Sequence, residues 1–147
     1  MKKTFTFFLS LFIISISYSQ NITGKWTGYF KLDGEFREHQ FEIEFVENKG
    51  KVEALTLSKF KMSGKQFYNI CKAKVAILKD SSSTKITVTE YEVSKGNNPE
   101  QSRICFQKHT LILSNTGTVY LLTGTWEPAR KSENCGKGTT ILTKNTE

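Results

Sequence analysis

Long apolar runs and helical periodicity are both missing from most of this chain. After residue 20, no apolar stretch approaches the ~20 residues that a membrane-spanning helix needs, and no segment keeps a period of 3.6 residues. These absences argue against a helical membrane protein and against a helical bundle. What is present instead is a period of two, with apolar and polar residues alternating, which is typical of β-strands.

Closely spaced metal ligands and catalytic motifs are also missing. The chain has three cysteines and two histidines, with no Cys-x-x-Cys pair and with His39 and His109 far apart, so a zinc site is unsupported. It has no Gly-x-Ser-x-Gly, no phosphate-binding loop and no justified Ser/His/Asp set. We therefore expect a protein that is not an enzyme and that uses no cofactor or metal. His39, beside the acids Glu38 and Glu42, is expected on the surface of a strand.

An N-terminal export signal is the exception to the lack of apolar runs. Two lysines precede an apolar stretch from Phe5 to Ile16, and Ser17-Tyr18-Ser19 supplies the small residues of a cleavage site. A membrane anchor is the alternative, but the stretch is shorter than a spanning helix requires. We expect residues 1–19 to be removed and residues 20–147 to form one domain, located in the periplasm or outside the cell.

Positive charge is concentrated in one part of the chain. Residues 51–79 contain seven lysines and a single acid, Glu53. Such a surface could face an anionic partner such as a lipid head group or an acidic glycan. The alternative is a solvated outer face whose lysines protect strand edges from aggregation. Arginines do not alternate with aromatics, which argues against nucleic acid. The candidate residues for an anionic partner are Lys59, Lys61, Lys72 and Lys74.

Turn signals divide the chain after residue 20 into eight candidate strands. Asn48-Lys49-Gly50 and Asn115-Thr116-Gly117 are the strongest hairpin signals among them. The expected strands lie near residues 23–32, 38–47, 51–60, 66–78, 84–94, 103–114, 118–127 and 139–145.

The alternation within these strands predicts the fold class. Phe41, Ile43 and Phe45 alternate with charged or polar residues, which indicates an apolar inner face and a charged outer face. Eight antiparallel strands with short loops predict an all-β fold, an eight-stranded up-and-down barrel. A β-sandwich is the alternative, but it needs longer crossovers, for which only 95–102 and 128–138 are candidates. A transmembrane barrel is disfavoured because outward faces carry charges in mid-strand.

A Gly-x-Trp motif occurs twice, as Gly24-Lys25-Trp26 and Gly124-Thr125-Trp126. A glycine two residues before a tryptophan lets the indole lie flat where a neighbouring backbone passes closely. On the first strand of an exported eight-stranded barrel, the motif resembles the lipocalin-like, or calycin, group, and residues 23–27 look like the opening strand of avidin-type barrels. This resemblance implies a small, mostly apolar ligand at the open end, Trp26 closing the other end, and Lys144 stacked on Trp26.

Three cysteines in an exported protein predict one disulfide and one free thiol. We favour Cys105–Cys135, because Cys105 is expected to start the sixth strand and Cys135 lies in the long loop before the eighth. Cys71 falls on the apolar face of its strand and is expected to be a buried free thiol.

Glu90 follows Ile86 and Val88 with a period of two, so its carboxylate is expected to point inward. A buried carboxylate needs a partner, because leaving it alone in an apolar interior is costly. The alternative is a register shift, or a strand end that emerges into solvent. The candidate partners are Tyr68, Arg103 and Lys108.

These observations predict an exported barrel that binds a small apolar or amphipathic molecule without transforming it. Aromatic side chains would supply contact area and Glu90 would orient the ligand, although aromatics in small barrels are usually core residues. One rival function is a filled barrel that acts as an interaction or inhibitor module through its lysine-rich outer surface. Another is a barrel enzyme built on an inward carboxylate. The candidate ligand-binding residues are Trp26, Tyr68, Glu90, Phe106 and Trp126.

Overall fold

The computed structural model describes residues 22–99 and 104–145, and the expected export signal and its cleavage site lie outside these residues. The described residues form strands without any helix. The strands are β1 (Gly24–Leu32), β2 (Glu38–Asn48), β3 (Lys51–Met62), β4 (Lys65–Lys79), β5 (Thr84–Gly96), β6 (Gln107–Asn115), β7 (Val119–Pro128) and β8 (Gly138–Asn145). No helix that could cross a membrane is found in this part of the chain.

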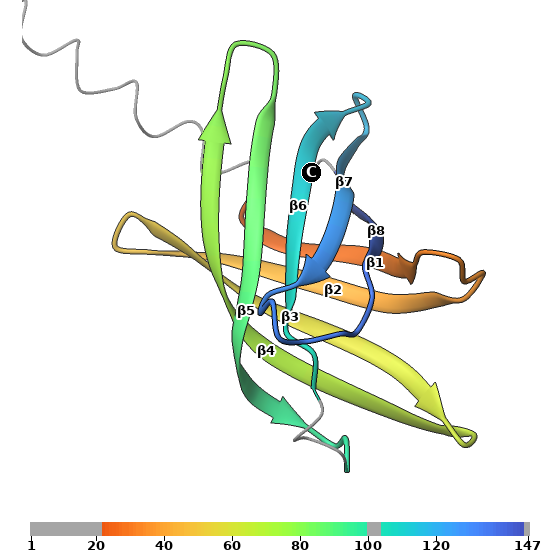
Figure 1. Cartoon of the computed structure of the whole chain (residues 1–147). Helices are drawn as coiled ribbons and strands as arrows, with labels where there is room; N and C mark the ends of the chain where they lie inside the picture. Colours follow the sequence, from red (N-terminus) through yellow and green to blue (C-terminus); the bar gives the residue numbers. More distant parts are fainter. Residues whose placement is uncertain (1–21, 100–103, 146–147) are drawn as a thin grey trace, which may run out of the picture.

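The strands pair in chain order and close into a barrel (Figure 1). Every pair is antiparallel, and the barrel closes where β1 pairs with β8, with Thr27 opposite Thr143. The predicted eight-stranded up-and-down barrel is confirmed, and the β-sandwich alternative is wrong. Because direct hairpin connections alternate between the two ends of such a barrel, the four connections after β1, β3, β5 and β7 lie at one end, which we call the open end.

The tight hairpins follow from residues that accept a positive φ. Lys49 and Gly50 between β2 and β3 have φ values of 51° and 76°, and Ser63 and Gly64 between β3 and β4 have values of 49° and 77°. Two consecutive positive φ values are the geometry of a type I′ turn, whose twist matches that of the flanking strands. The turns therefore fix the register of three neighbouring strands.

The sixth strand begins later than predicted. It starts at Gln107, so Cys105 precedes the strand and does not start it. The pairing with β5 stops at Thr89 opposite Lys108, because the backbone N–H of Gln107 donates to the side chain of Glu90. A side-chain acceptor thus replaces the next bond of the ladder.

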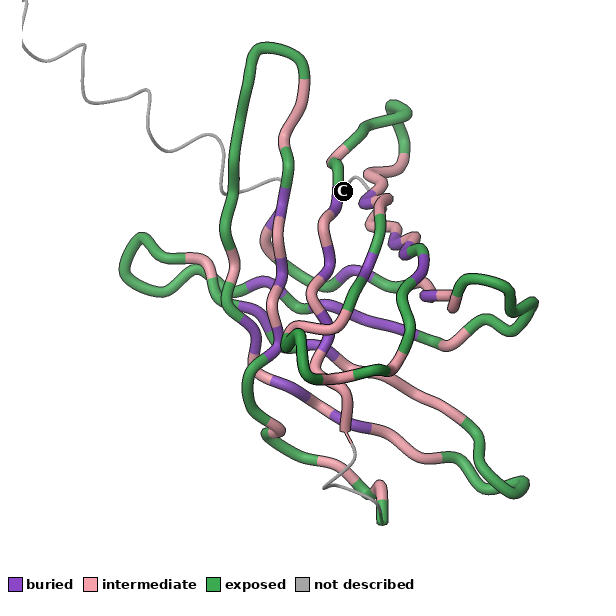
Figure 2. The backbone as a smooth tube through the Cα atoms, in the orientation of Figure 1, coloured by how far each residue is buried: buried purple, intermediate pink, exposed green. Residues whose placement is uncertain are grey.

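The core fills the middle of the barrel and one of its ends. Figure 2 shows buried segments in mid-strand and exposed hairpin tips. On β2 the predicted alternation is confirmed, since Phe41, Ile43 and Phe45 are at most 1% exposed. The fully buried neighbours from other strands include Trp26, Ile86, Val88, Leu111, Leu122 and Leu142.

The two Gly-x-Trp glycines differ in their physical role. At Gly124 a Cβ atom would lie 1.9 Å from the carbonyl oxygen of Thr110, so the predicted close approach of a neighbouring backbone is confirmed there. At Gly24 the prediction is wrong: the nearest atom to such a Cβ is Lys144 Nζ at 3.7 Å, and the constraint is a φ of +98°. Gly28, two residues after Trp26, makes the close approach instead, at 2.1 Å from the carbonyl oxygen of Ile141.

Candidate ligand cavity

A cavity of about 480 Å³ opens at the open end of the barrel. Its lining includes residues from all four connections or the strand ends beside them, such as Arg37, Met62, Asn98 and Cys135. Sites for small molecules commonly have volumes of ~300–1,000 Å³, so the cavity has room for one small ligand. The barrel interior is therefore filled at one end and hollow at the other.

Aromatic rings form the apolar part of the lining. Trp126 packs edge-on against Phe30, with ring centroids 5.4 Å apart, and Phe60 and Met62 also line the cavity. The indole Nε1 of Trp126 donates to the carbonyl oxygen of Lys31 at 2.8 Å. Because this N–H is already satisfied, Trp126 presents only an apolar surface to a ligand.

Glu90 lies in the cavity lining and is only 4% exposed, so its predicted inward orientation is confirmed. One carboxylate oxygen accepts from the hydroxyl of Thr56, and the other accepts from the backbone N–H of Gln107 at 2.8 Å. Burial raises the pKa of Glu90 to about 7, although both hydrogen bonds act to lower it. The pairing of β4 with β5 becomes irregular just beyond Glu90, between Lys72 and Ala73.

The predicted partners of Glu90 are wrong where the structure describes them. Lys108 follows the inward-facing Gln107 and so lies on the outside, where it pairs with Glu127 at 3.1 Å. Tyr68 precedes the inward-facing Asn69 and likewise belongs to the outer face of β4. Arg103 lies outside the described residues. The sequence missed Thr56 and Gln107 because a hydroxyl and a backbone N–H carry no charge pattern that marks them as partners.

His109 forms a second buried polar group beneath the cavity. Its Nε2 lies 3.0 Å from Gln107 Oε1 and its Nδ1 lies 2.9 Å from Thr140 Oγ1. Since an amide oxygen only accepts, Nε2 carries the proton and Nδ1 accepts from the hydroxyl of Thr140. Burial lowers the pKa of His109 to about 3, so the ring is neutral. Its period-two spacing from the buried Leu111 was the signal that could have located it.

Two polar atoms in the lining have no hydrogen-bond partner among the described residues: Asn69 Oδ1 and His39 Nε2. Asn69 is 8% exposed. His39 lines the cavity and stacks on Phe30, with ring centroids 5.1 Å apart, so its predicted place on the surface is wrong. The reason is the alternation of side chains along β2: His39 lies two residues before Phe41 and therefore shares its inward face. Burial lowers the pKa of His39, which favours the neutral ring.

The structure brings together two of the five predicted ligand-binding residues, Glu90 and Trp126. Trp26, Tyr68 and Phe106 do not line the cavity. Phe106 lies under the guanidinium of Arg130, which is 4.6 Å from the ring centroid. The lining residues that were not among those five include Phe30, His39, Ser58, Phe60, Asn69 and Gln107.

Trp26 closes the opposite end of the barrel, as the resemblance implied. It is fully buried, and its Nε1 donates to the carbonyl oxygen of Ile22 at 2.8 Å. Lys144 Nζ lies 5.7 Å from the centroid of the Trp26 ring and also donates to the carbonyl oxygen of Thr23. The predicted stacking of Lys144 on Trp26 is confirmed.

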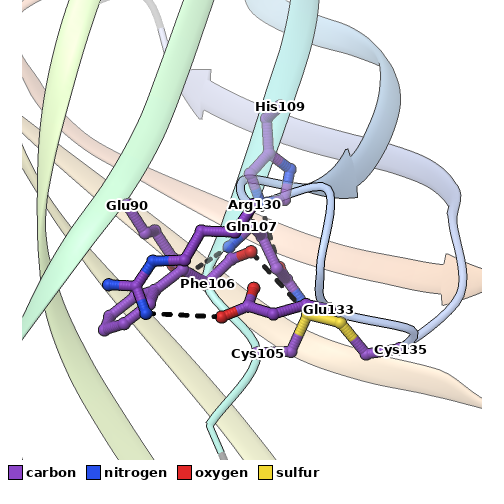
Figure 3. The surroundings of a disulfide bond; sticks show 8 residues. All are labelled: Glu90, Cys105, Phe106, Gln107, His109, Arg130, Glu133 and Cys135. Carbon is purple, nitrogen blue, oxygen red and sulfur yellow. Dashed lines mark hydrogen bonds and ion pairs between the residues drawn. A yellow bond between two sulfur atoms is a disulfide. The ribbon is translucent and has the colours of Figure 1, made fainter.

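The predicted disulfide joins Cys105 to Cys135, with Cα atoms 6.2 Å apart, and both residues line the cavity (Figure 3). It ties the segment before β6 to the connection between β7 and β8. In the same connection, Arg130 and Glu133 form an ion pair of 3.6 Å. Glu133 with the two cysteines is also the one group of potential metal ligands found among the described residues, but both sulfurs are used by the disulfide.

The third cysteine, Cys71, is free and buried, as predicted. Burial raises the pKa of its thiol to about 12, and the neighbouring Glu90 acts in the same direction. The thiol therefore stays protonated, and it is a poor nucleophile.

The candidate lysines for an anionic partner are partly engaged within the protein. Lys59 lies 3.6 Å from Glu42, and Lys72 lies 2.9 Å from Glu92. Lys74 Nζ lies 5.6 Å from the ring centroid of Tyr91, and Lys61 lines the cavity. An anionic partner at these residues stays a prediction.

The geometry defines the class of this protein as a small closed β-barrel with a cavity at one end. Comparison with family models, curated proteins and solved structures finds no match to the chain. The barrel is compatible with the lipocalin-like architecture, and membership of that group stays a prediction.

Proposed function

We propose that this protein is an exported binding protein that takes up one small apolar or amphipathic molecule at the open end of its barrel. The observation that carries the proposal is the cavity of about 480 Å³, which combines aromatic walls with a few buried polar groups. This combination is typical of small-molecule sites, where apolar surface supplies affinity and few polar groups fix orientation. The disulfide supports export, because such bonds persist in oxidising compartments.

The proposal includes binding without chemical conversion. Cys71 is held as a thiol, and His109 uses both ring nitrogens in hydrogen bonds beneath the cavity. Glu90 is fixed by Thr56 and Gln107, which suits a group that orients a ligand. The rival function through the lysine-rich surface has less support, because Lys59 and Lys72 already pair with acids.

Native mass spectrometry of protein purified from its exported fraction tests the proposal first. We expect a bound molecule that is lost on denaturation. The apolar dye Nile red provides a second test that does not depend on the natural ligand. Protein that carries no molecule and also binds no dye would overturn the function.

A matched pair of variants locates the binding site. Ser58 lines the cavity, whereas its neighbour Leu57 points to the other face of β3. Ser58→Trp should fill the cavity and abolish dye binding, and Leu57→Trp should preserve it. Equal dye binding by both variants would place the site elsewhere and contradict the proposal.

A further inference from the structure

Two buried residues in the cavity lining, Glu90 and Asn69, have acceptor capacity that no hydrogen bond of the described residues uses. Asn69 Oδ1 has no hydrogen-bond partner among the described residues. Each oxygen of Glu90 accepts one hydrogen bond, whereas a carboxylate oxygen has capacity for two. Both residues lie on the inward faces of adjacent strands, β4 and β5, where Glu90 is opposite Ala73. Unused acceptor capacity is thus concentrated on one wall.

Cationic side chains of the described lining lie beside the mouth of the cavity and not on its buried wall. The two cationic residues in the described lining, Arg37 and Lys61, are both exposed and lie beside the mouth of the cavity. His39 lies deeper, but burial lowers its pKa and favours the neutral ring. Glu90 is therefore the one buried carboxylate in the described lining, and no buried cationic side chain is found there.

The apolar walls lie on other strands. Phe30 comes from β1, Phe60 from β3 and Trp126 from β7, and the N–H of Trp126 is already bonded to the backbone. A ligand that fits both sets of groups has an apolar body and one polar end that donates hydrogen bonds.

Building on the proposed function, we propose that the cavity selects amphipathic molecules whose polar end is a hydrogen-bond donor, above all a protonated primary amine, and that Glu90 and Asn69 receive this group. An ammonium group has three donors and no acceptor, which complements acceptors at two levels of this wall, with Asn69 opposite Gly96 and Glu90 opposite Ala73. Its charge also compensates the buried carboxylate, for which the described residues provide no cationic partner. A carboxylic acid ligand would instead place a second anion beside Glu90.

Three probes with the same alkyl chain test this selectivity: decylamine, decanol and decanoate. Isothermal titration calorimetry at about pH 8 keeps Glu90 mostly ionised, since its pKa is about 7. We expect decylamine to bind about tenfold or more tightly than decanoate, with decanol between them, because hydrogen bonds to charged groups contribute more than neutral ones. Decanoate binding as tightly as decylamine would overturn the inference.

Glu90→Gln tests the role of the carboxylate. The substitution retains the shape, and the amide can accept from the Gln107 N–H while donating to the Thr56 hydroxyl, so the fold should persist. We expect decylamine to lose about tenfold in affinity and decanol to change by less than about threefold. The matched control is Glu92→Gln, an exposed carboxylate on the same strand, which should leave both affinities unchanged.

Asn69→Leu provides a second test that does not involve Glu90. Removal of the unpartnered acceptor should weaken decylamine and decanol, while Nile red still binds. If Glu90→Gln and Asn69→Leu both leave the ratio of amine to alcohol affinity unchanged, the donor selectivity is wrong and the proposed function stands. If neither the three probes nor Nile red bind the wild-type protein, the proposed function fails and the inference fails with it.

Discussion

The two ends of the barrel contain the same Gly-x-Trp motif and use it differently. Trp26 and Trp126 each donate from Nε1 to a backbone carbonyl oxygen at 2.8 Å. Trp26 is fully enclosed, whereas Trp126 lies at the edge of a cavity. The motif orients and satisfies an indole, and the residues around it decide whether the indole seals the barrel or lines a cavity.

Those surrounding residues differ in polarity and in size. Around Trp26 the packing includes Ile22 at 2% exposure and Phe45 at 1%, and the Lys144 ammonium covers the ring. Around the cavity the inward residues include Ser58 and Asn69, which are too small or too polar to fill the space. One end is therefore specialised for stability and the other retains room for a ligand.

Alanine substitutions of the two tryptophans should separate these roles most strongly. Trp26→Ala removes a large side chain from a closed core and should cost about 3–5 kcal/mol of unfolding free energy. Trp126→Ala should cost less, because it enlarges an existing opening, but it should weaken dye binding. Urea denaturation and Nile red titration measure the two effects. Equal losses of stability would contradict the division between a sealed end and an open end.

The disulfide should be the largest single source of stability at the open end. Cys105 and Cys135 are 30 residues apart in sequence, and a loop of this length predicts about 3–4 kcal/mol from chain entropy. The Cys105→Ser, Cys135→Ser double variant should lose this amount in urea denaturation and should also weaken dye binding, since both residues line the cavity. Cys71→Ala is the control for cysteine removal. If the double variant binds dye normally, the bridge stabilises the fold without shaping the cavity.

The fold was predictable from the sequence because alternation and turn chemistry act locally. Phe41, Ile43 and Phe45 fixed the inner face of one strand, and residues such as Gly50 and Gly117 marked hairpins through their positive φ values. The disulfide followed from chain order once the barrel was assumed. The largest displacement of a strand boundary, at the start of β6, depends on a contact of Glu90 that no local pattern contains.

The cavity was less predictable, because its lining depends on how far each strand extends past its neighbours. Alternation alone placed Glu90 inside. It could also have placed His39 and Asn69 there, because each lies two residues before a residue predicted to face inward, Phe41 and Cys71 respectively. Strand order, more than alternation, separates the two tryptophans. β1 and β7 run in the same direction, with Trp26 near the start of β1 and Trp126 near the end of β7, so they lie at opposite ends of the barrel.

Two buried ionisable groups between the ends should give opposite pH dependences of stability. Glu90 has a pKa raised from 4.5 to about 7, so its contribution is complete below 4.5 and is lost as pH rises through 7. His109 has a pKa lowered from 6.5 to about 3, so its contribution is complete above 6.5 and is lost as pH falls through 3. Between 4.5 and 6.5 the two effects oppose each other.

Single substitutions should reveal each dependence. In Glu90→Gln, the remaining contribution of His109 should raise stability by about 4 kcal/mol from pH 3 to 6.5. In His109→Gln, the remaining contribution of Glu90 should instead lower stability by about 3 kcal/mol from pH 4.5 to 7. Urea denaturation across this range measures both. Subtracting each variant's profile from that of the wild-type protein cancels the titrating groups that the two proteins share and leaves the contribution of the substituted residue, which should fall from pH 4.5 to 7 for Glu90 and rise from pH 3 to 6.5 for His109. Identical pH profiles for the two variants would contradict the opposed signs.

The smallest effect should come from Asn69, and it bears most directly on why the open end is hollow. Asn69→Leu removes a buried oxygen that has no partner among the described residues, and it should stabilise the ligand-free protein by about 1 kcal/mol. The same substitution should weaken decylamine binding. Asn69→Asp, which keeps an acceptor and adds a negative charge, should retain or strengthen decylamine binding. A gain of stability together with a loss of affinity means that an unfavourable polar atom is kept at this end for binding, whereas a loss of stability would mean that Asn69 supports the fold.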